Sequence, residues 1–148
     1  RTLLVDHFDA LRESFQVAHA ARPFALLAWT ILPDHLHCAW RLPEGDDDNG
    51  TRWRHIKSHF SRTLPSGERL SQRRREKSER GIWQRRYWEQ WIRDEDHLCR
   101  CIDYIHINPQ KHGHVARIAD WPHSSFHRHV RMGRLSVDWA CDIGTGPS

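Results

Sequence analysis

The most constraining feature of the sequence is residues 25–42, where an apolar run is followed by a turn and then by an alternating segment. Residues 25–32, ALLAWTIL, form an apolar run that is rich in strand formers. Pro33 and Asp34 are typical of a turn, and residues 35–42, HLHCAWRL, alternate as a half-buried strand does. The pattern predicts a β-hairpin that supplies the central strands of a sheet.

His35 and His37 lie two positions apart on the second predicted strand. Residues at that spacing point to the same face, so both imidazoles can hold one divalent ion, while Leu36 and Cys38 face a core on the other side. The carboxylate of Asp34 could orient a ring N–H of the pair. In a chain with 13 histidines such a pair also arises by chance. Its predicted position on a central strand is what favours a metal site.

Helices are predicted on both sides of the hairpin. Apolar residues spaced by three and four predict a helix over residues 4–20, and a second helix begins at about Thr51, after an acidic loop at residues 43–50. The second helix is predicted to bury Trp53, Ile56, Phe60 and Leu64 and to expose Arg52, Lys57, Ser58 and Arg62. Ser124 is the expected cap of a short final helix that Gly133 ends.

A further helix, predicted from Asp94 to near Pro109, carries the second candidate group. Its buried stripe is Leu98, Ile102 and Ile105. Tyr104 lies about 200° around the helix from Ile102, so it leaves the core face, and Asn108 follows on the face of Tyr104. If the fold brings Tyr104 beside an ion held by the histidines, the phenol can attack a phosphodiester that the ion polarises. The alternative is an ordinary half-buried tyrosine followed by a helix-ending Asn-Pro.

Positive charge is concentrated in the middle of the chain. Residues 51–93 hold 13 Lys and Arg against 4 Asp and Glu, whereas residues 1–50 hold 4 against 8 and residues 94–148 hold 6 against 7. Within this region, residues 65–81 are predicted to form a mobile basic loop, and residues 82–91 an aromatic-rich strand or hairpin. The charge attracts a polyanion, and the eight tryptophans offer faces for exposed bases. Single-stranded or hairpin DNA is the predicted partner; the alternative is a solvated charged face over core tryptophans.

The length and the cysteines set further bounds. The 148 residues predict a single domain, residues 1–148. No stretch approaches the ~20 consecutive apolar residues of a membrane span, so we expect a cytoplasmic protein with no membrane partner. The four cysteines lack C-x-x-C spacing and are expected to be free thiols, although Cys99 and Cys101 could contribute to a zinc site.

Four segments, taken in order, resemble the bacterial REP-associated tyrosine transposases, which belong to the single-tyrosine HUH transposase group. They are LPDHLHCAWRLPEGDDD, TRWRHIKSHFSR, WQRRYWEQWIRDEDHLCRCIDYIHINPQKHGHV and DWPHSSFHRHV. The resemblance runs from about Pro23 to Trp139. It implies a ferredoxin-like α/β (α+β) sandwich, in which helices pack on an antiparallel sheet and the HUH motif lies on a central strand. The sequence departs from the family in lacking its first strand and in having Ile107 where an aromatic residue is usual.

The resemblance also implies a site and a mechanism. His35, His37 and Asn108 are the implied ligands of magnesium or manganese, and no nucleotide cofactor is needed. Tyr104 is the implied nucleophile, which forms a 5′-phosphotyrosine and frees a 3′-OH. The implied substrates are palindromic REP hairpins with single strands beside them, in the nucleoid of a bacterial cell. The basic residues expected to hold the DNA are Arg52, Arg54, Lys57, Arg85, Arg86 and Lys111.

Three questions stay open at the level of the sequence. A phenol needs activation to act as a nucleophile at neutral pH, and His106 and Lys111 are both candidates. The chain could instead be a non-catalytic hairpin-binding module with relic histidines, or a DNA-binding domain stabilised by zinc on Cys99 or Cys101. The oligomeric state, monomer or dimer, is not determined.

Overall fold

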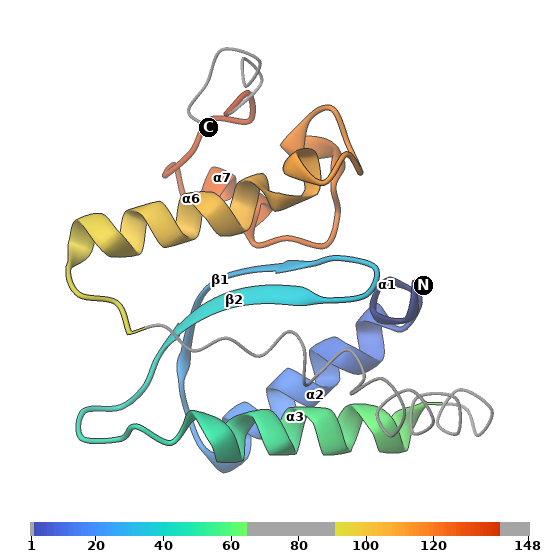
Figure 1. The fold of residues 1–148 in the computed structure, drawn as a ribbon, viewed down its shortest axis with the longest axis vertical. Helices are drawn as coiled ribbons and strands as arrows, with labels where there is room; N and C mark the ends of the chain where they lie inside the picture. The colour runs from blue at the N-terminus through green and yellow to red at the C-terminus, as the bar shows by residue number, and fades with distance from the viewer. Residues whose placement is uncertain (1, 65–90, 140–148) are drawn as a thin grey trace. The chain divides into compact units, whose positions relative to one another are not determined.

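The computed structural model describes residues 2–64 and 91–139. Within these ranges the chain is an α+β protein, as predicted, and it falls into two compact units (Figure 1). The helical unit contains α1 (Leu3–Asp6), α2 (Phe8–Ala21) and α3 (Asn49–Thr63). The hairpin unit contains nearly all of β1 (Ala25–Ile31) and β2 (Leu36–Arg41), with α6 (Glu95–Lys111), the 3-10 helix η1 (Ile118–Asp120) and α7 (Phe126–Arg131).

In the helical unit, α2 and α3 lie side by side and pack against each other (Figure 1). The edge of the Phe15 ring meets Trp53, with ring centroids 6.1 Å apart, and Ser14 Oγ lies 2.8 Å from His59 Nδ1. The buried apolar side chains of this unit are Leu3, Leu4, Leu11, Ala18, Phe24, Ile56, Phe60 and Leu64. The single helix predicted over residues 4–20 is wrong, because the backbone of His7 leaves the helical region and separates α1 from α2.

The start of α3 shows why part of the predicted acidic loop is helical. Asp48 is the N-cap, and its side chain accepts a hydrogen bond from the Thr51 N–H at 2.9 Å. A carboxylate at this position satisfies one of the N–H groups that the first turn leaves without a partner. The helix therefore begins at Asn49 rather than at Thr51.

In the hairpin unit, β1 and β2 form a two-stranded antiparallel sheet, and α6 lies across one face of it (Figure 1). Ala28 and Ala39 from the strands and Ile105 from α6 form the buried cluster between them. The other edge of β1 meets the segment before α7 through a bridge between Thr30 and Ser124. The described part of the sheet has these two strands, so the central position predicted for β2 stays a prediction.

Helix α6 starts as predicted but continues further. The Asp94 side chain accepts a hydrogen bond from the His97 N–H at 2.8 Å and caps the helix. The helix was predicted to end near Pro109; it ends at Lys111, and Pro109 lies inside it. Proline has no N–H to donate to the carbonyl group of Ile105, and the Thr30 hydroxyl donates to that carbonyl at 2.7 Å instead. A bond from β1 thus replaces the missing helical bond.

Other predictions fall partly outside the described residues. The basic loop predicted at residues 65–81 lies outside them, as do residues 82–90 of the predicted strand, and Trp91 is not in a strand. Ser124 was expected to cap the final helix, but the N-cap of α7 is Ser125; Ser124 Oγ accepts the Phe126 N–H at 3.1 Å from one residue before the cap. No helix in the two described ranges is long and apolar enough to cross a membrane. The single domain stays a prediction.

Candidate active site

Strand β2 and helix α6 bring His37 and Tyr104 together. Strand alternation places His37 on the face of Ala39, which packs with Ala28 and Ile105 under the helix. The ring centroids of His37 and Tyr104 lie 5.8 Å apart, and the rings are nearly perpendicular at 84°. Tyr104 is 46% exposed, so the prediction that this side chain leaves the core face is confirmed.

Asn108 lies one turn after Tyr104 and is fully buried. Its Nδ2 donates to the Tyr104 carbonyl at 2.9 Å, whereas its Oδ1 has no hydrogen-bond partner among the described residues. An unpaired buried acceptor costs about 1–3 kcal/mol, and such atoms in native proteins call for a water or an ion. An amide oxygen is also a ligand that hard divalent ions accept. Asn108 therefore fits the predicted ion.

His35 comes one residue before β2, and its Nδ1 lies 2.7 Å from Asp34 Oδ1. This contact confirms the predicted pairing of an imidazole with the Asp34 carboxylate, which fixes the ring orientation. Because Nδ1 is engaged, Nε2 is the nitrogen with which His35 would hold an ion. His35 belongs to the helical unit and His37 to the hairpin unit, so the convergence of the two imidazoles stays a prediction.

The described residues contain no group of three or more His, Cys, Asp or Glu side chains that could hold a metal. A site built from two imidazoles and an amide oxygen does not require such a group, so the predicted magnesium or manganese stays a prediction. Cys99 is exposed and Cys101 is partly buried. Neither belongs to a group of zinc ligands within the described ranges.

The structure separates the two candidates for activating the phenol. Lys111 Nζ lies over the Tyr104 ring, 4.8 Å from its centroid. His106 is fully buried, and its Nε2 lies 2.8 Å from Ser125 Oγ. Burial, reinforced by the charge of the neighbouring His129, lowers the pKa of His106 to about 3. Such an imidazole is a weak base, and Lys111 is the candidate that contacts Tyr104.

Two hydroxyl groups that sequence reasoning missed hold α6 against β1. Ser125 Oγ accepts the Trp29 N–H at 2.8 Å and also contacts His106 of α6. Thr30 Oγ1 donates to the α6 carbonyl group that Pro109 leaves without a helical donor. In the sequence, Pro109 indicated that such a bond is needed, because a buried carbonyl group that lacks its helical donor requires a donor from elsewhere in the chain.

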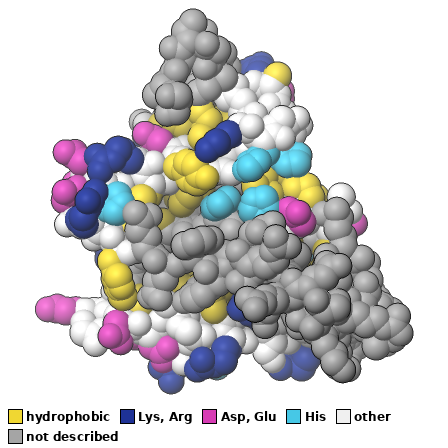
Figure 2. Space-filling view, in the orientation of Figure 1, with side chains coloured by type: hydrophobic (Ala, Val, Ile, Leu, Met, Phe, Trp, Pro, Cys, Tyr) yellow, Lys and Arg dark blue, Asp and Glu magenta, His cyan; other side chains and the backbone are white. Residues whose placement is uncertain are grey.

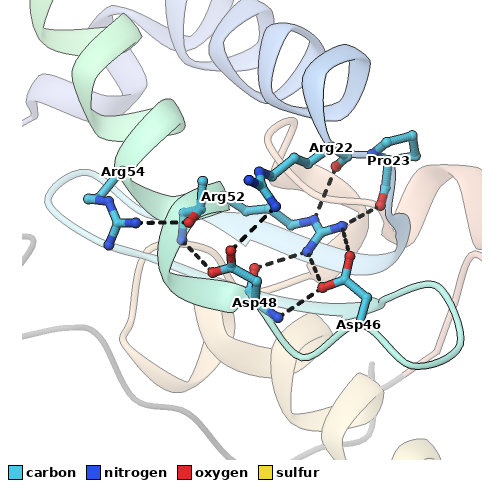
Figure 3. A network of polar contacts seen from close by, with 7 residues as sticks. Arg22, Pro23, Asp46, Asp48, Arg52 and Arg54 are labelled. Atoms are coloured by element: carbon cyan, nitrogen blue, oxygen red, sulfur yellow. Dashed lines mark hydrogen bonds and ion pairs between the residues drawn. The ribbon is translucent and has the colours of Figure 1, made fainter.

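Arg52 was predicted to be exposed and to bind DNA, and the structure corrects this. The side chain is only 1% exposed. Its guanidinium makes five hydrogen bonds, to the carbonyl groups of Arg22, Pro23 and Asp48 and to both carboxylate oxygens of Asp46 (Figure 3). A guanidinium has five N–H donors, so none remains for a phosphate. Helical periodicity misplaced Arg52 because it takes no account of the loop that folds over this face.

The other predicted DNA-binding residues keep that role as a prediction. Arg54 is exposed and donates to Thr51 Oγ1 at 2.8 Å. Lys57 is partly buried on α3, and Lys111 is exposed at the end of α6. Arg85 and Arg86 lie outside the described residues.

No protein-family model matches the sequence, but individual proteins do. A REP-associated tyrosine transposase of Escherichia coli (strain K12) is 42% identical over 141 residues, which cover 95% of this chain and 78% of the relative. A relative from Haemophilus influenzae with the same family name is 42% identical over 140 residues, which cover 94% of this chain and 80% of the relative.

A solved structure has a similar fold. It is the structure of a REP-associated tyrosine transposase bound to a REP hairpin, with a TM-score of 0.81 and 40% identity, and the match covers 99% of this chain and 79% of that chain. The identity over nearly the whole length and the shared α+β fold agree with each other. This chain belongs to the family of REP-associated tyrosine transposases.

Proposed function

We propose that this chain is a metal-dependent endonuclease and strand transferase that acts on single-stranded DNA beside REP-type hairpins. The observation that carries the proposal is the contact between His37 and Tyr104, with the unpaired Oδ1 of Asn108 one turn along the same helix. These groups suit phosphodiester cleavage, because a phenol can supply the attacking oxygen while an imidazole and an amide oxygen hold an ion. The names of the relatives and the hairpin bound by the structural neighbour support this choice of substrate.

In the proposed reaction, Tyr104 Oη attacks the scissile phosphorus in line with the departing 3′ oxygen. The P–O3′ bond breaks, a 5′-phosphotyrosine forms as the phenol gives up its proton, and the 3′ oxygen takes up a proton and leaves as a hydroxyl group. The phosphotyrosine conserves the energy of the broken bond, so a 3′-OH can later attack the phosphorus, form a new P–O3′ bond and release the Tyr104 phenol. Bound magnesium or manganese would polarise the scissile phosphate, and His35, His37 and Asn108 are the residues that would hold it.

Lys111 has a supporting role in this proposal. Its ammonium group lies over the Tyr104 ring, where a cation–π contact restricts the movement of the phenol. A positive charge beside the reacting groups also stabilises the negative charge that develops during the attack. Arg54 and Lys57, with Arg85 and Arg86, would hold the phosphates of the bound strand.

The proposal is tested by detecting the covalent adduct between the protein and the cut DNA. The protein is incubated with a REP-type hairpin carrying single-stranded flanks, in magnesium or manganese, and the products are separated on a denaturing gel. Tyr104→Phe keeps the ring but removes the attacking oxygen, so neither cleavage nor adduct is expected. Tyr87→Phe is the matched control, because Tyr87 is the other of the two tyrosines, and its adduct should equal that of the wild type.

Two results would count against the proposal. Undiminished cutting by Tyr104→Phe would eliminate this nucleophile. Hairpin binding by the wild type without cutting in either ion would favour the non-catalytic binding module.

A further inference from the structure

Four aromatic rings lie in series beyond the C-terminal end of α6. The ring centroids of His112 and His114 are 6.5 Å apart, those of His114 and Trp121 are 5.3 Å apart, and those of Trp121 and His123 are 5.8 Å apart. The His114 and Trp121 rings are tilted by only 31°, close to a stacked arrangement. We call these four residues the ring ladder. Histidine side chains are visible near the middle of the face drawn in Figure 2.

The first two rings of the ladder are exposed. His112 and His114 are exposed, whereas Trp121 and His123 are partly buried. Accessible aromatic rings offer flat faces on which another flat ring can stack. The His114 imidazole lies beside the indole of Trp121 and is exposed, so solvent and a ligand can reach it.

The backbone holds the ladder in place independently of the ring contacts. Gly113 has a φ of +78°, which turns the chain sharply between the two exposed histidines. The N–H of His114 donates to the carbonyl of Pro109 at 2.8 Å, and Gln110 Nε2 donates to the carbonyl of Ala116 at 3.0 Å. Trp121 Nε1 donates to a carbonyl group of β1 at 3.0 Å. The turn is therefore secured by hydrogen bonds, and its stability does not require His114 to be aromatic.

We propose that the ring ladder is a stacking site for unpaired nucleobases of the DNA strand that passes Tyr104. The proposal rests on the proposed function, because it needs single-stranded DNA at the phenol. The rise of a helix places His112 about 12 Å along α6 from Tyr104, so the ladder would reach bases close to the cut phosphate. Lys111, which lies between the phenol and the ladder in sequence and is exposed, provides a positive charge for the intervening backbone.

Unpaired bases suit this surface better than a duplex does. Every base has a flat face, and stacking on an aromatic ring is tolerant of sequence. Bases within a duplex are already stacked on their neighbours and cannot reach a ring. The ladder is therefore expected to contribute to binding of a single-stranded flank and to contribute nothing to binding of the paired stem.

The test compares two ligands and three variants. The ligands are a REP-type hairpin with single-stranded flanks and the same hairpin without flanks, and affinity is measured by fluorescence anisotropy. His114→Ala should bind the flanked hairpin about 10-fold more weakly than the wild type, within the range for loss of one base–aromatic stack, and should bind the flankless hairpin equally well. His114→Phe keeps a ring and should restore binding of the flanked hairpin.

The matched control is His19→Ala, which removes an exposed histidine whose ring also contacts another aromatic ring, that of Phe24, in the helical unit. This variant should bind both ligands as the wild type does. Equal affinity of wild type and His114→Ala for the flanked hairpin would overturn the stacking site and leave the proposed function intact. Failure of the wild type to bind either hairpin would instead contradict the proposed function.

Discussion

Arg52 in the helical unit and Asn108 in the hairpin unit are both buried polar side chains, but their hydrogen bonding differs. The guanidinium of Arg52 makes five hydrogen bonds within the unit (Figure 3). Asn108 uses its Nδ2, and its Oδ1 has no partner among the described residues. A buried polar group whose hydrogen bonds are all made is compatible with a stable fold. A buried group that lacks a partner lowers the stability of the fold, so its presence calls for an explanation.

The same difference separates Asp46 from His106. The hydrogen bonds from Arg52 and from the Asp48 N–H lower the pKa of Asp46 to about 2, so the carboxylate stays charged and paired. His106 is kept neutral by its burial, and its Nδ1 has no partner in the described ranges. The polar groups of Arg52 and Asp46 are thus paired with each other, whereas Asn108 and His106 on α6 each keep one buried atom without a partner among the described residues.

Among the substitutions that test this comparison, the largest expected effect is that of Asn108→Leu on cleavage. Leucine has a similar shape but no oxygen, so an ion would lose a ligand, and we expect cleavage in magnesium to fall by about 100-fold or more. Unfolding in urea should change little, because the substitution also removes the unpaired Oδ1. Asn108→Asp, which keeps an oxygen, should retain part of the activity. Full activity of Asn108→Leu would show that the unpaired oxygen has no part in the reaction.

Arg52→Met tests whether the fully paired guanidinium of the helical unit stabilises the fold. Removing the guanidinium leaves the carbonyl groups of Arg22 and Pro23 without their donor, and we expect the free energy of unfolding to fall by about 3 kcal/mol. The control is Arg54→Met, whose exposed side chain should cost less than about 1 kcal/mol. Both values come from urea denaturation. Equal stability of the two variants would contradict the structural role of Arg52.

The pH dependence of stability should separate the two units. The pKa of His106 is about 3 in the folded protein and is near 6.5 in an unfolded chain. Because the unfolded state takes up the proton first, the contribution of neutral His106 is fully present above about pH 6.5 and is lost progressively as the pH falls toward 3. The contribution of Asp46 is present above about pH 4 and is lost as the pH falls from 4 to 2.

These two pH ranges can be tested by measuring the free energy of unfolding as a function of pH. Between pH 7 and pH 4.5, the free energy of unfolding of the wild type should fall more steeply than that of His106→Gln. Asp46→Asn should keep the wild-type slope over this range, although its overall stability is lower. A slope that depends on Asp46 and not on His106 would reverse the assignment.

The smallest expected effect is that of Thr30→Val, which removes the hydroxyl that donates to the Ile105 carbonyl beside Pro109. We expect a loss of about 1.5 kcal/mol in the free energy of unfolding. Thr30→Ser keeps the hydroxyl and should recover most of that loss. If Thr30→Val is as stable as the wild type and Thr30→Ser is less stable, packing of the methyl group, and not the hydrogen bond, holds α6 on β1.

The sequence by itself determined the features that depend on neighbours along the chain. The apolar run with its turn specified the hairpin, Asp94 specified the start of α6, and helical spacing placed Tyr104 on an exposed face. The proximity of Asp34 to His35 was likewise a local matter. These features follow from the periods of strands and helices, which covalent geometry fixes.

Only the tertiary structure decided which partners distant residues acquire. Arg52 is buried because carbonyl groups about thirty residues earlier and the acidic loop surround it. Helix α6 continues past Pro109 because Thr30, 75 residues before Ile105, supplies the missing donor. His106 and Lys111 are close in sequence, but one faces Ser125 in the core and the other lies over Tyr104. No local pattern encodes these choices, because each depends on a donor or acceptor that only the folded chain brings within hydrogen-bonding distance.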